Sequence, residues 1–210
     1  SNETGAPVPA FDAAAFSAET AAAPAYSYDT LASSGSLTSA QILSLSVPKD
    51  SLYGKNGIFL PENAALTGRA AERECRADFF YEQGSSVASQ AVGIRVSPSA
   101  TLLSRPDLRL YARSVYDGNS AFSLFPDFSE EDRDRLLLKY NGTKEYRLMQ
   151  ALAPLGLPFP EAAACSLFIN GAYYGEYLLT EYPDTAYIAS RYSLDAEDIA
   201  LLSDLTQESG

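Results

Sequence analysis

Hydrophobic and polar residues alternate along much of the chain after residue 40, which is the pattern of half-buried β-strands. Two further strand-like runs lie on either side of Asn170-Gly171. An Asn-Gly pair between apolar runs is a strong hairpin signal, because both residues tolerate positive φ. The earlier strands are predicted at residues 42–47, 75–82, 91–97, 108–113 and 136–140.

A helical period occurs just before the hairpin. Leu148, Leu152 and Leu155 recur at i, i+4 and i+7, so we predict a helix over residues 144–155 with one apolar face. Gly156 follows that face and is suited to end the helix.

The chain after the hairpin also favours helices. Asp184 is suited to cap a helix that runs through Tyr192, and Ser193 or Asp195 to cap a last helix over residues 197–205. Strands, one helix, a hairpin and final helices, in this order, are typical of an α+β domain with a mainly antiparallel sheet.

The first 40 residues differ in composition from the rest. They are rich in Ala, Ser and Pro and have no clean period, so we interpret residues 1–40 as an arm and residues 41–210 as the folded domain. A disordered linker and an arm that docks on a surface or partner are both compatible with this composition. The arm's aromatic residues, which suit the docked alternative, are Phe11, Phe16, Tyr26 and Tyr28.

Charge and residue usage exclude several classes of protein. The net charge is −12, which argues against nucleic acid and anionic membranes as bulk partners. The chain has no His, which excludes serine-hydrolase triads, Cys-His proteases and His-ligated zinc sites built from this chain alone. No apolar run approaches the ~20 residues of a membrane helix. No signal peptide is visible, and a leader removed before Ser1 is compatible with the sequence.

Cys75 and Cys165 each stand in an apolar, strand-like context. Two cysteines are too few for a zinc cluster. Buried free thiols and a disulfide are both possible for this pair, and the apolar context favours thiols.

An ordered series of short motifs spans residues 42–205. It includes DFF at 78–80, GIR at 93–95, LRLYAR at 108–113 and, as its most specific part, INGAYYGEY at 169–177. Each motif is weak alone. Taken in order, the series resembles the first part of the spore coat protein H-like kinases, the CotH kinase family.

This resemblance implies a fold and a function. The fold would be the nucleotide-binding N-lobe of an atypical protein-kinase-like domain, with residues 144–155 as its αC-like helix. The cofactor would be ATP with Mg or Mn, and the partners would be surface or spore-coat proteins that become phosphorylated. The location would be extracellular, on the cell surface or in the spore coat. The family's catalytic and metal-binding Asp residues lie in a later region, so we assign no catalytic residue and no metal ligand.

Departures from the family pattern guide the choice of site residues. Phosphate binding there relies on a Gly-rich turn and a Lys, but residues 97–107 contain neither, although they offer hydroxyl groups. Arginines are the available substitutes, and Glu181 and Tyr182 stand where the resemblance places the adenine. The candidate cofactor-binding residues are therefore Arg95, Arg105, Arg109 and Glu181. Ordinary solvated positions are the alternative for the three arginines.

Three functions stay open at this point. The first is an ATP-dependent phosphotransferase, and the second is a degenerate, non-catalytic module for assembly on a spore or cell surface. The third is a carbohydrate-binding or structural module. The missing Gly and Lys favour the second, and the absence of Trp disfavours the third, because sugar platforms use large aromatic faces.

Overall fold

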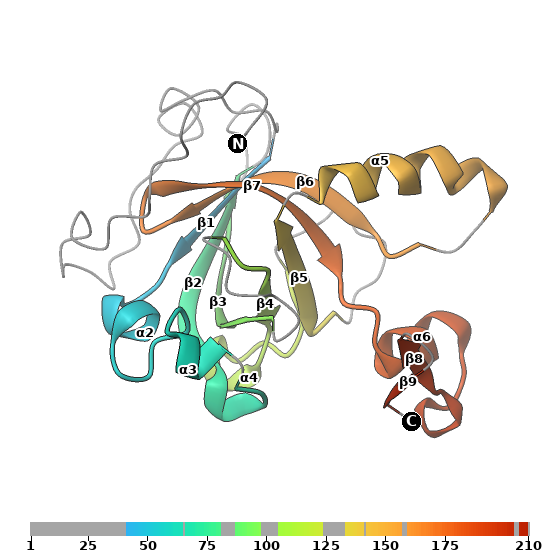
Figure 1. Cartoon of the computed structure of the whole chain (residues 1–210), viewed down its shortest axis with the longest axis horizontal. Coiled ribbons are helices and arrows are strands. Elements are labelled where there is room, and N and C mark those ends of the chain that lie inside the picture. The colour runs from blue at the N-terminus through green and yellow to red at the C-terminus, as the bar shows by residue number, and fades with distance from the viewer. Residues whose placement is uncertain are drawn as a thin grey trace.

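Seven strands form a closed barrel in the order β1-β2-β3-β4-β5-β7-β6 (Figure 1). The computed structural model describes residues 41–64, 66–80, 87–97, 105–123, 133–140, 142–156, 159–203 and 206–209. Neighbouring strands run antiparallel, except that β1 and β6 run parallel and so close the barrel. The barrel strands are β1 (Ile42–Ser46), β2 (Arg73–Phe80), β3 (Val87–Val96), β4 (Leu108–Tyr111), β5 (Arg135–Tyr140), β6 (Ala162–Ile169) and β7 (Ala172–Glu181).

The alternation seen in the sequence separates the inside of the barrel from its outside. On β4, Leu108 and Leu110 are fully buried in the interior core, and the residues between and after them, Arg109 and Tyr111, take the outer face. The same period of two holds on β1, β2, β3, β5 and β6, whereas on β7 a register shift near Gly175 interrupts it. Every strand predicted from alternation is present, with its ends shifted by a few residues, which confirms those predictions.

The predicted Asn-Gly hairpin joins β6 to β7. Asn170 and Gly171 have φ values of 51° and 83°, as a tight two-residue turn requires. The Asn170 side chain also accepts a hydrogen bond from the Val47 N–H (2.7 Å) and donates one to the Val47 carbonyl (2.9 Å). One residue thus forms the turn and holds the end of β1 against β6, where the barrel closes.

The predicted fold class is wrong. We expected an α+β N-lobe of a protein-kinase-like fold, with an αC-like helix and C-terminal helices, and the structure is a closed mixed β-barrel with few helices. The parallel pairing of β1 with β6, two strands far apart in sequence, closes the sheet. A closed sheet leaves its apolar face inside the barrel, so that face cannot receive a helix.

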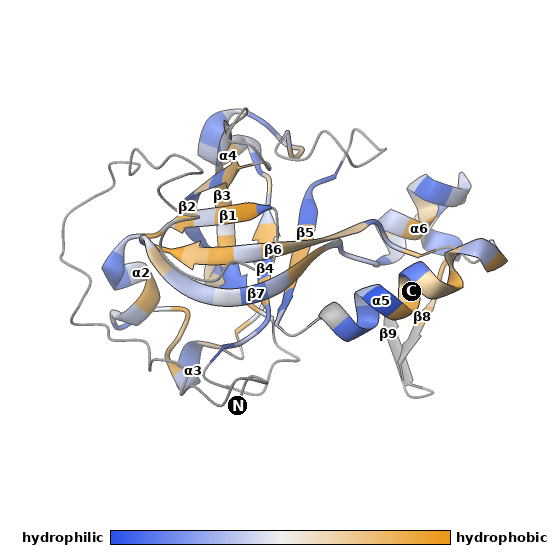
Figure 2. Ribbon diagram, turned by 90° about the horizontal axis from the view of Figure 1, so that it is seen from above, coloured by the Kyte–Doolittle hydropathy of each residue, from blue (hydrophilic) through white to orange (hydrophobic). Residues whose placement is uncertain are grey.

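The helix expected to pack on that sheet lies to the side of the barrel, near β6 and β7 (Figures 1 and 2). It consists of α5 (Thr143–Leu152) followed by the 3-10 turn η3 (Ala153–Leu155). The helix itself was predicted, but its apolar face is not packed on the sheet: Leu148 is 58% exposed and Leu155 is 69% exposed.

The segment after the barrel confirms one helix prediction and overturns another. Asp184 caps α6 (Thr185–Tyr192) by accepting a hydrogen bond from the Tyr187 N–H at 2.9 Å. The last predicted helix is wrong. In its place η4 (Ala196–Asp198) makes a single turn, and the chain after it forms β8 (Leu201–Ser203), which pairs with β9 (Thr206–Ser209).

Short helices connect the strands at one end of the barrel (Figure 1). Many of their residues are hydrophilic (Figure 2). None exceeds five residues. They are α2 (Lys49–Tyr53), α3 (Pro61–Ala64), η2 (Arg69–Ala71) and α4 (Ser114–Asp117).

Cys75 and Cys165 are buried free thiols, as the apolar context favoured. Burial raises the pKa of both thiols above the ordinary value. Among the residues that the structure describes, no helix has the length and apolar character needed to cross a bilayer. The predicted arm, residues 1–40, lies outside the described residues, as do residues 98–104 of the segment that replaces the family's phosphate turn.

Candidate anion-binding site

Arg95 and Arg109, two of the predicted site residues, are direct cross-strand partners on β3 and β4. Directly opposed residues of an antiparallel pair lie on the same face of the sheet. That face is the outside of the barrel, because the flanking residues Ile94, Leu108 and Leu110 belong to the interior core. The fold therefore brings two guanidinium groups together on one outer surface.

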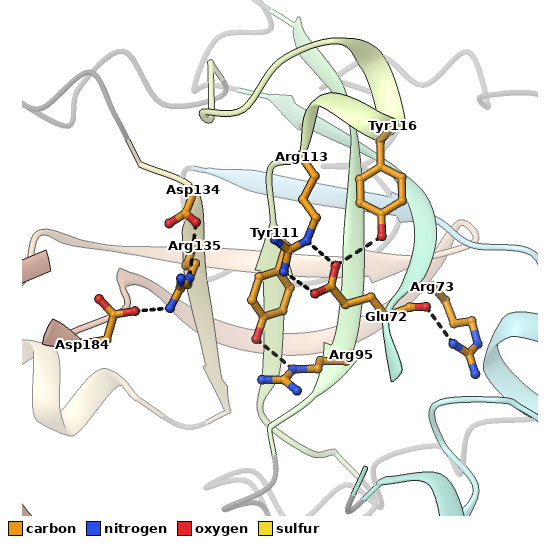
Figure 3. Close-up of polar contacts among 9 residues, drawn as sticks. All are labelled: Glu72, Arg73, Arg95, Tyr111, Arg113, Tyr116, Asp134, Arg135 and Asp184. Atoms are coloured by element: carbon orange, nitrogen blue, oxygen red, sulfur yellow. Dashed lines mark hydrogen bonds and ion pairs between the residues drawn. The ribbon is translucent and has the colours of Figure 1, made fainter. Parts of the chain in front are cut away.

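Arg95 is only 9% exposed. Its Nε donates a hydrogen bond to the Tyr111 hydroxyl at 2.8 Å, and its Cζ lies 5.2 Å from the centre of the Tyr111 ring (Figure 3). Its Nη1 is buried and has no hydrogen-bond partner among the described residues. One nitrogen of this guanidinium is thus held in place, and another lacks an acceptor.

Arg109 has a similar environment. Its Cζ lies 4.4 Å from the centre of the Tyr182 ring, which follows the end of β7, and this distance is typical of a cation–π contact. Its Nε is buried without a hydrogen-bond partner in the described part of the chain. Each arginine therefore contacts a tyrosine, Arg95 at Tyr111 and Arg109 at Tyr182, and neither contact neutralises its charge.

A neutralised cluster adjoins this pair. Arg113 donates two hydrogen bonds to the Glu72 carboxylate, one of them from Nε at 2.7 Å, and the Tyr116 hydroxyl donates a third at 3.2 Å (Figure 3). The hydrogen bonds with Glu72 raise the pKa of Arg113, and burial followed by the charge of Glu72 raises the pKa of Tyr116. Arg113 also lies over the Tyr111 ring at 4.9 Å, so that ring links the two clusters.

Gly93 makes room for the Glu72 cluster. A Cβ at this position would lie 2.8 Å from both the Glu72 Oε2 and the Tyr116 hydroxyl. The glycine of the Gly-Ile-Arg motif therefore has a packing role here: it lets a carboxylate and a tyrosine lie flat on β3.

Among the residues that the structure describes, the arginines neighbouring the Arg95–Arg109 pair have carboxylate partners, unlike the pair itself. Glu72 balances Arg113, and Arg135 on β5 is held by Asp184 and Asp134. Within the described residues, Arg95 and Arg109 have no carboxylate partner. Opposed like charges on neighbouring strands repel each other, and a buried charged donor without an acceptor is costly. An anion between the two guanidinium groups would remove both costs, and a phosphate fits because its oxygens match the arginine fork.

The other two predicted site residues lie elsewhere. The Glu181 side chain is 2% exposed and fully engaged: it accepts from Arg133 Nε at 2.6 Å and from the Glu161 N–H at 2.7 Å. Arg105 lies over the Tyr140 ring at 5.5 Å and donates to its hydroxyl at 3.3 Å. Glu181 is thus a structural ion-pair residue, and no contact in the described structure joins Arg105 to Arg95 or Arg109.

Sequence reasoning missed one residue of the site, Tyr111. It placed Tyr182 near the adenine through the resemblance, but it did not indicate that this ring contacts Arg109. Tyr111 stands two positions after Arg109, so the β-strand period alone placed it on the same face. Tyr182 reaches Arg109 only because β7 pairs with β5 and ends beside it, which no local pattern indicates.

No protein-family model and no curated protein sequence matches this chain. Among the described residues, no group of three or more Cys, Asp and Glu is arranged to hold a metal ion.

Proposed function

We propose that this chain is a CotH-related module that binds the phosphates of a nucleotide on the outer face of β3 and β4, without catalysing phosphoryl transfer. The observation that carries the proposal is the Arg95–Arg109 pair, whose buried N–H groups lack acceptors within the described residues. The resemblance of the motif series supplies the nucleotide, with ATP and Mg or Mn as the expected form.

Binding without transfer fits the chemistry of this face. Phosphoryl transfer needs a carboxylate that is available as a base or metal ligand. The carboxylate of the adjoining cluster, Glu72, is held by Arg113 and Tyr116, so it has little capacity left for either role. The proposal therefore follows the degenerate, non-catalytic alternative, in a protein of the cell surface or spore coat whose partners are other surface proteins.

Thermal unfolding of the full chain tests the proposal. We expect the melting temperature to rise most with ATP in the presence of Mg²⁺ or Mn²⁺, to rise less with inorganic tripolyphosphate, and to stay unchanged with adenosine. Ligand that binds only the native state stabilises it by mass action. Arg95→Gln and Arg109→Gln should each abolish most of the shift. The matched control is Arg76→Gln, which removes the same charge from an outer position of β2.

The ligand series separates the two parts of the proposal. An equal response to tripolyphosphate and ATP would retain the anion site and reject the nucleotide as its specific ligand. No response to either ligand, or a response that survives both arginine substitutions, would reject the site itself.

A further inference from the structure

A second apolar cluster lies on the outside of the barrel, on β1, β2 and β6. Ile42, Phe80 and Phe168 are between 0% and 2% exposed, yet none of them belongs to the interior core. Strand pairing places Ile42 opposite Phe80, and Ser44 opposite Phe168, so these side chains share the outer face. We call Ile42, Ser44, Asp78, Phe80 and Phe168 the β1 outer face.

Polar atoms on and beside this face lack partners. The Asp78 Oδ1 accepts from Arg76 Nε at 2.9 Å and from the Ser89 hydroxyl, but its Oδ2 is buried and unpaired. Gln41 Oε1 and the hydroxyls of Ser44 and Ser46 are also buried without hydrogen-bond partners among the described residues. Buried atoms of this kind require donors and acceptors from whatever covers them.

No helix among the described elements packs extensively on β1 or β2. Helix α5 contacts β6 and β7, α4 contacts β3, and β1 and β2 have their main contacts with neighbouring strands. Figures 1 and 2 show α5 and α6 beside the ends of β6 and β7 that lie away from β1. The β1 outer face therefore needs an occupant that combines apolar side chains with backbone hydrogen-bonding groups.

We propose that residues 1–40 of the same chain pack on the β1 outer face. This segment is followed directly by Gln41, whose carbonyl accepts a hydrogen bond from the Ser166 N–H at 2.9 Å and which leads into β1. The segment thus starts at the edge of the face. Reach is no obstacle, because 40 extended residues span roughly 130 Å and a five-residue strand only about 17 Å.

The composition of the segment suits this surface. Its many Ala and Ser residues let the backbone approach closely, so that its N–H groups and hydroxyls reach the unpaired oxygen atoms. Its aromatic residues supply the apolar contacts for Ile42, Phe80 and Phe168. The docked arm, one of the two alternatives for this composition, is the one that the barrel favours. This inference does not depend on the anion site.

Tryptophan fluorescence tests the proposal in the full chain, which contains no Trp. Four single variants place one reporter each: Phe11→Trp, Phe16→Trp, Tyr26→Trp and Tyr28→Trp. We expect at least one reporter to emit at a shorter wavelength than in the urea-unfolded chain and to resist acrylamide quenching. Adding Phe80→Lys should reverse both effects, whereas Leu137→Lys, an outer substitution on β5 across the barrel, should not.

The outcomes decide the proposal. It is overturned if all four reporters behave as in the unfolded chain, or if Phe80→Lys leaves a protected reporter protected. A blue shift that grows with protein concentration would also overturn it, because the occupant would then be the arm of a second copy. If circular dichroism shows that Phe80→Lys does not fold, Ser46→Lys, at the less buried end of β1, replaces it as the face variant.

Discussion

At the scale of single residues, the three residues of the Gly-Ile-Arg segment have three different roles. Gly93 leaves room for the Glu72 cluster on the outer face, Ile94 fills the barrel core, and Arg95 belongs to the proposed anion site. The sequence indicated a special role for this segment through its resemblance to a known motif. It did not indicate that Glu72, a residue 21 positions earlier in the numbering, lies over the glycine.

We predict that Gly93→Ala destabilises the protein by about 1–3 kcal/mol, the usual cost of forcing atoms into a packed site. The added methyl group would displace the Glu72 carboxylate or the Tyr116 ring. Urea unfolding measures the loss. In a Glu72→Ala background the same substitution should cost clearly less, because one obstructing group is gone. Equal costs in the two backgrounds would contradict this packing role.

At the scale of elements, local patterns predicted most strands and the hairpin, because period-two alternation and an Asn-Gly turn are local signals. They also located α5 and the Asp184 cap. The expected packing of the α5 leucines was wrong, because helical periodicity shows that an apolar face exists but not whether another element covers it. Leu148 and Leu155 are exposed, whereas Leu136 and Leu138 of β5 are fully buried.

This difference gives a prediction for matched leucines. Leu148→Gln on α5 should change the free energy of unfolding by no more than about 0.5 kcal/mol, as is usual for a surface position. Leu138→Ala in the barrel core should cost about 2–5 kcal/mol. Both are read from urea unfolding curves. A loss above about 2 kcal/mol for Leu148→Gln would mean that α5 is packed, and would contradict the exposed helix.

At the scale of the whole molecule, the fold class was beyond the reach of local patterns. The barrel closes through β1 and β6, whose pairing residues are more than 100 positions apart. The Asn-Gly signal marked the turn, but the bonds from Asn170 to Val47 that hold the closing strands together became visible only in the structure. Part of the proposed anion site was predictable, because both of its arginines were candidates. Their cross-strand pairing and their contacts with tyrosine depend on the assembled barrel.

The buried core also sets the response of the whole molecule to alkaline pH. Burial raises the pKa of Cys75, Cys165 and Tyr177, so the native state retains these protons after the unfolded chain releases them. Their contribution to stability is present below the unfolded pKa values, about 8.5 for Cys and 10 for Tyr, and is lost as the pH rises above them.

We therefore expect the free energy of unfolding, measured under reducing conditions, to fall between pH 7 and pH 10 by about 2 kcal/mol for each buried thiol. Cys165→Ala should remove one of these contributions to the pH dependence, whatever its effect on stability at pH 7. A free energy of unfolding that stays constant over this range would contradict the burial of the two thiols.

The central claim is that Arg95 and Arg109 act together as a phosphate site. Isothermal titration calorimetry of the full chain with magnesium ATP tests it most directly, with Arg95→Gln beside Arg76→Gln as the matched control. Loss of a charged hydrogen bond of about 1.5–3 kcal/mol weakens binding by about tenfold or more. The account predicts such a loss for Arg95→Gln and an unchanged affinity for Arg76→Gln. Equal affinities for the unsubstituted protein and both variants, or no binding by the unsubstituted protein, would contradict it.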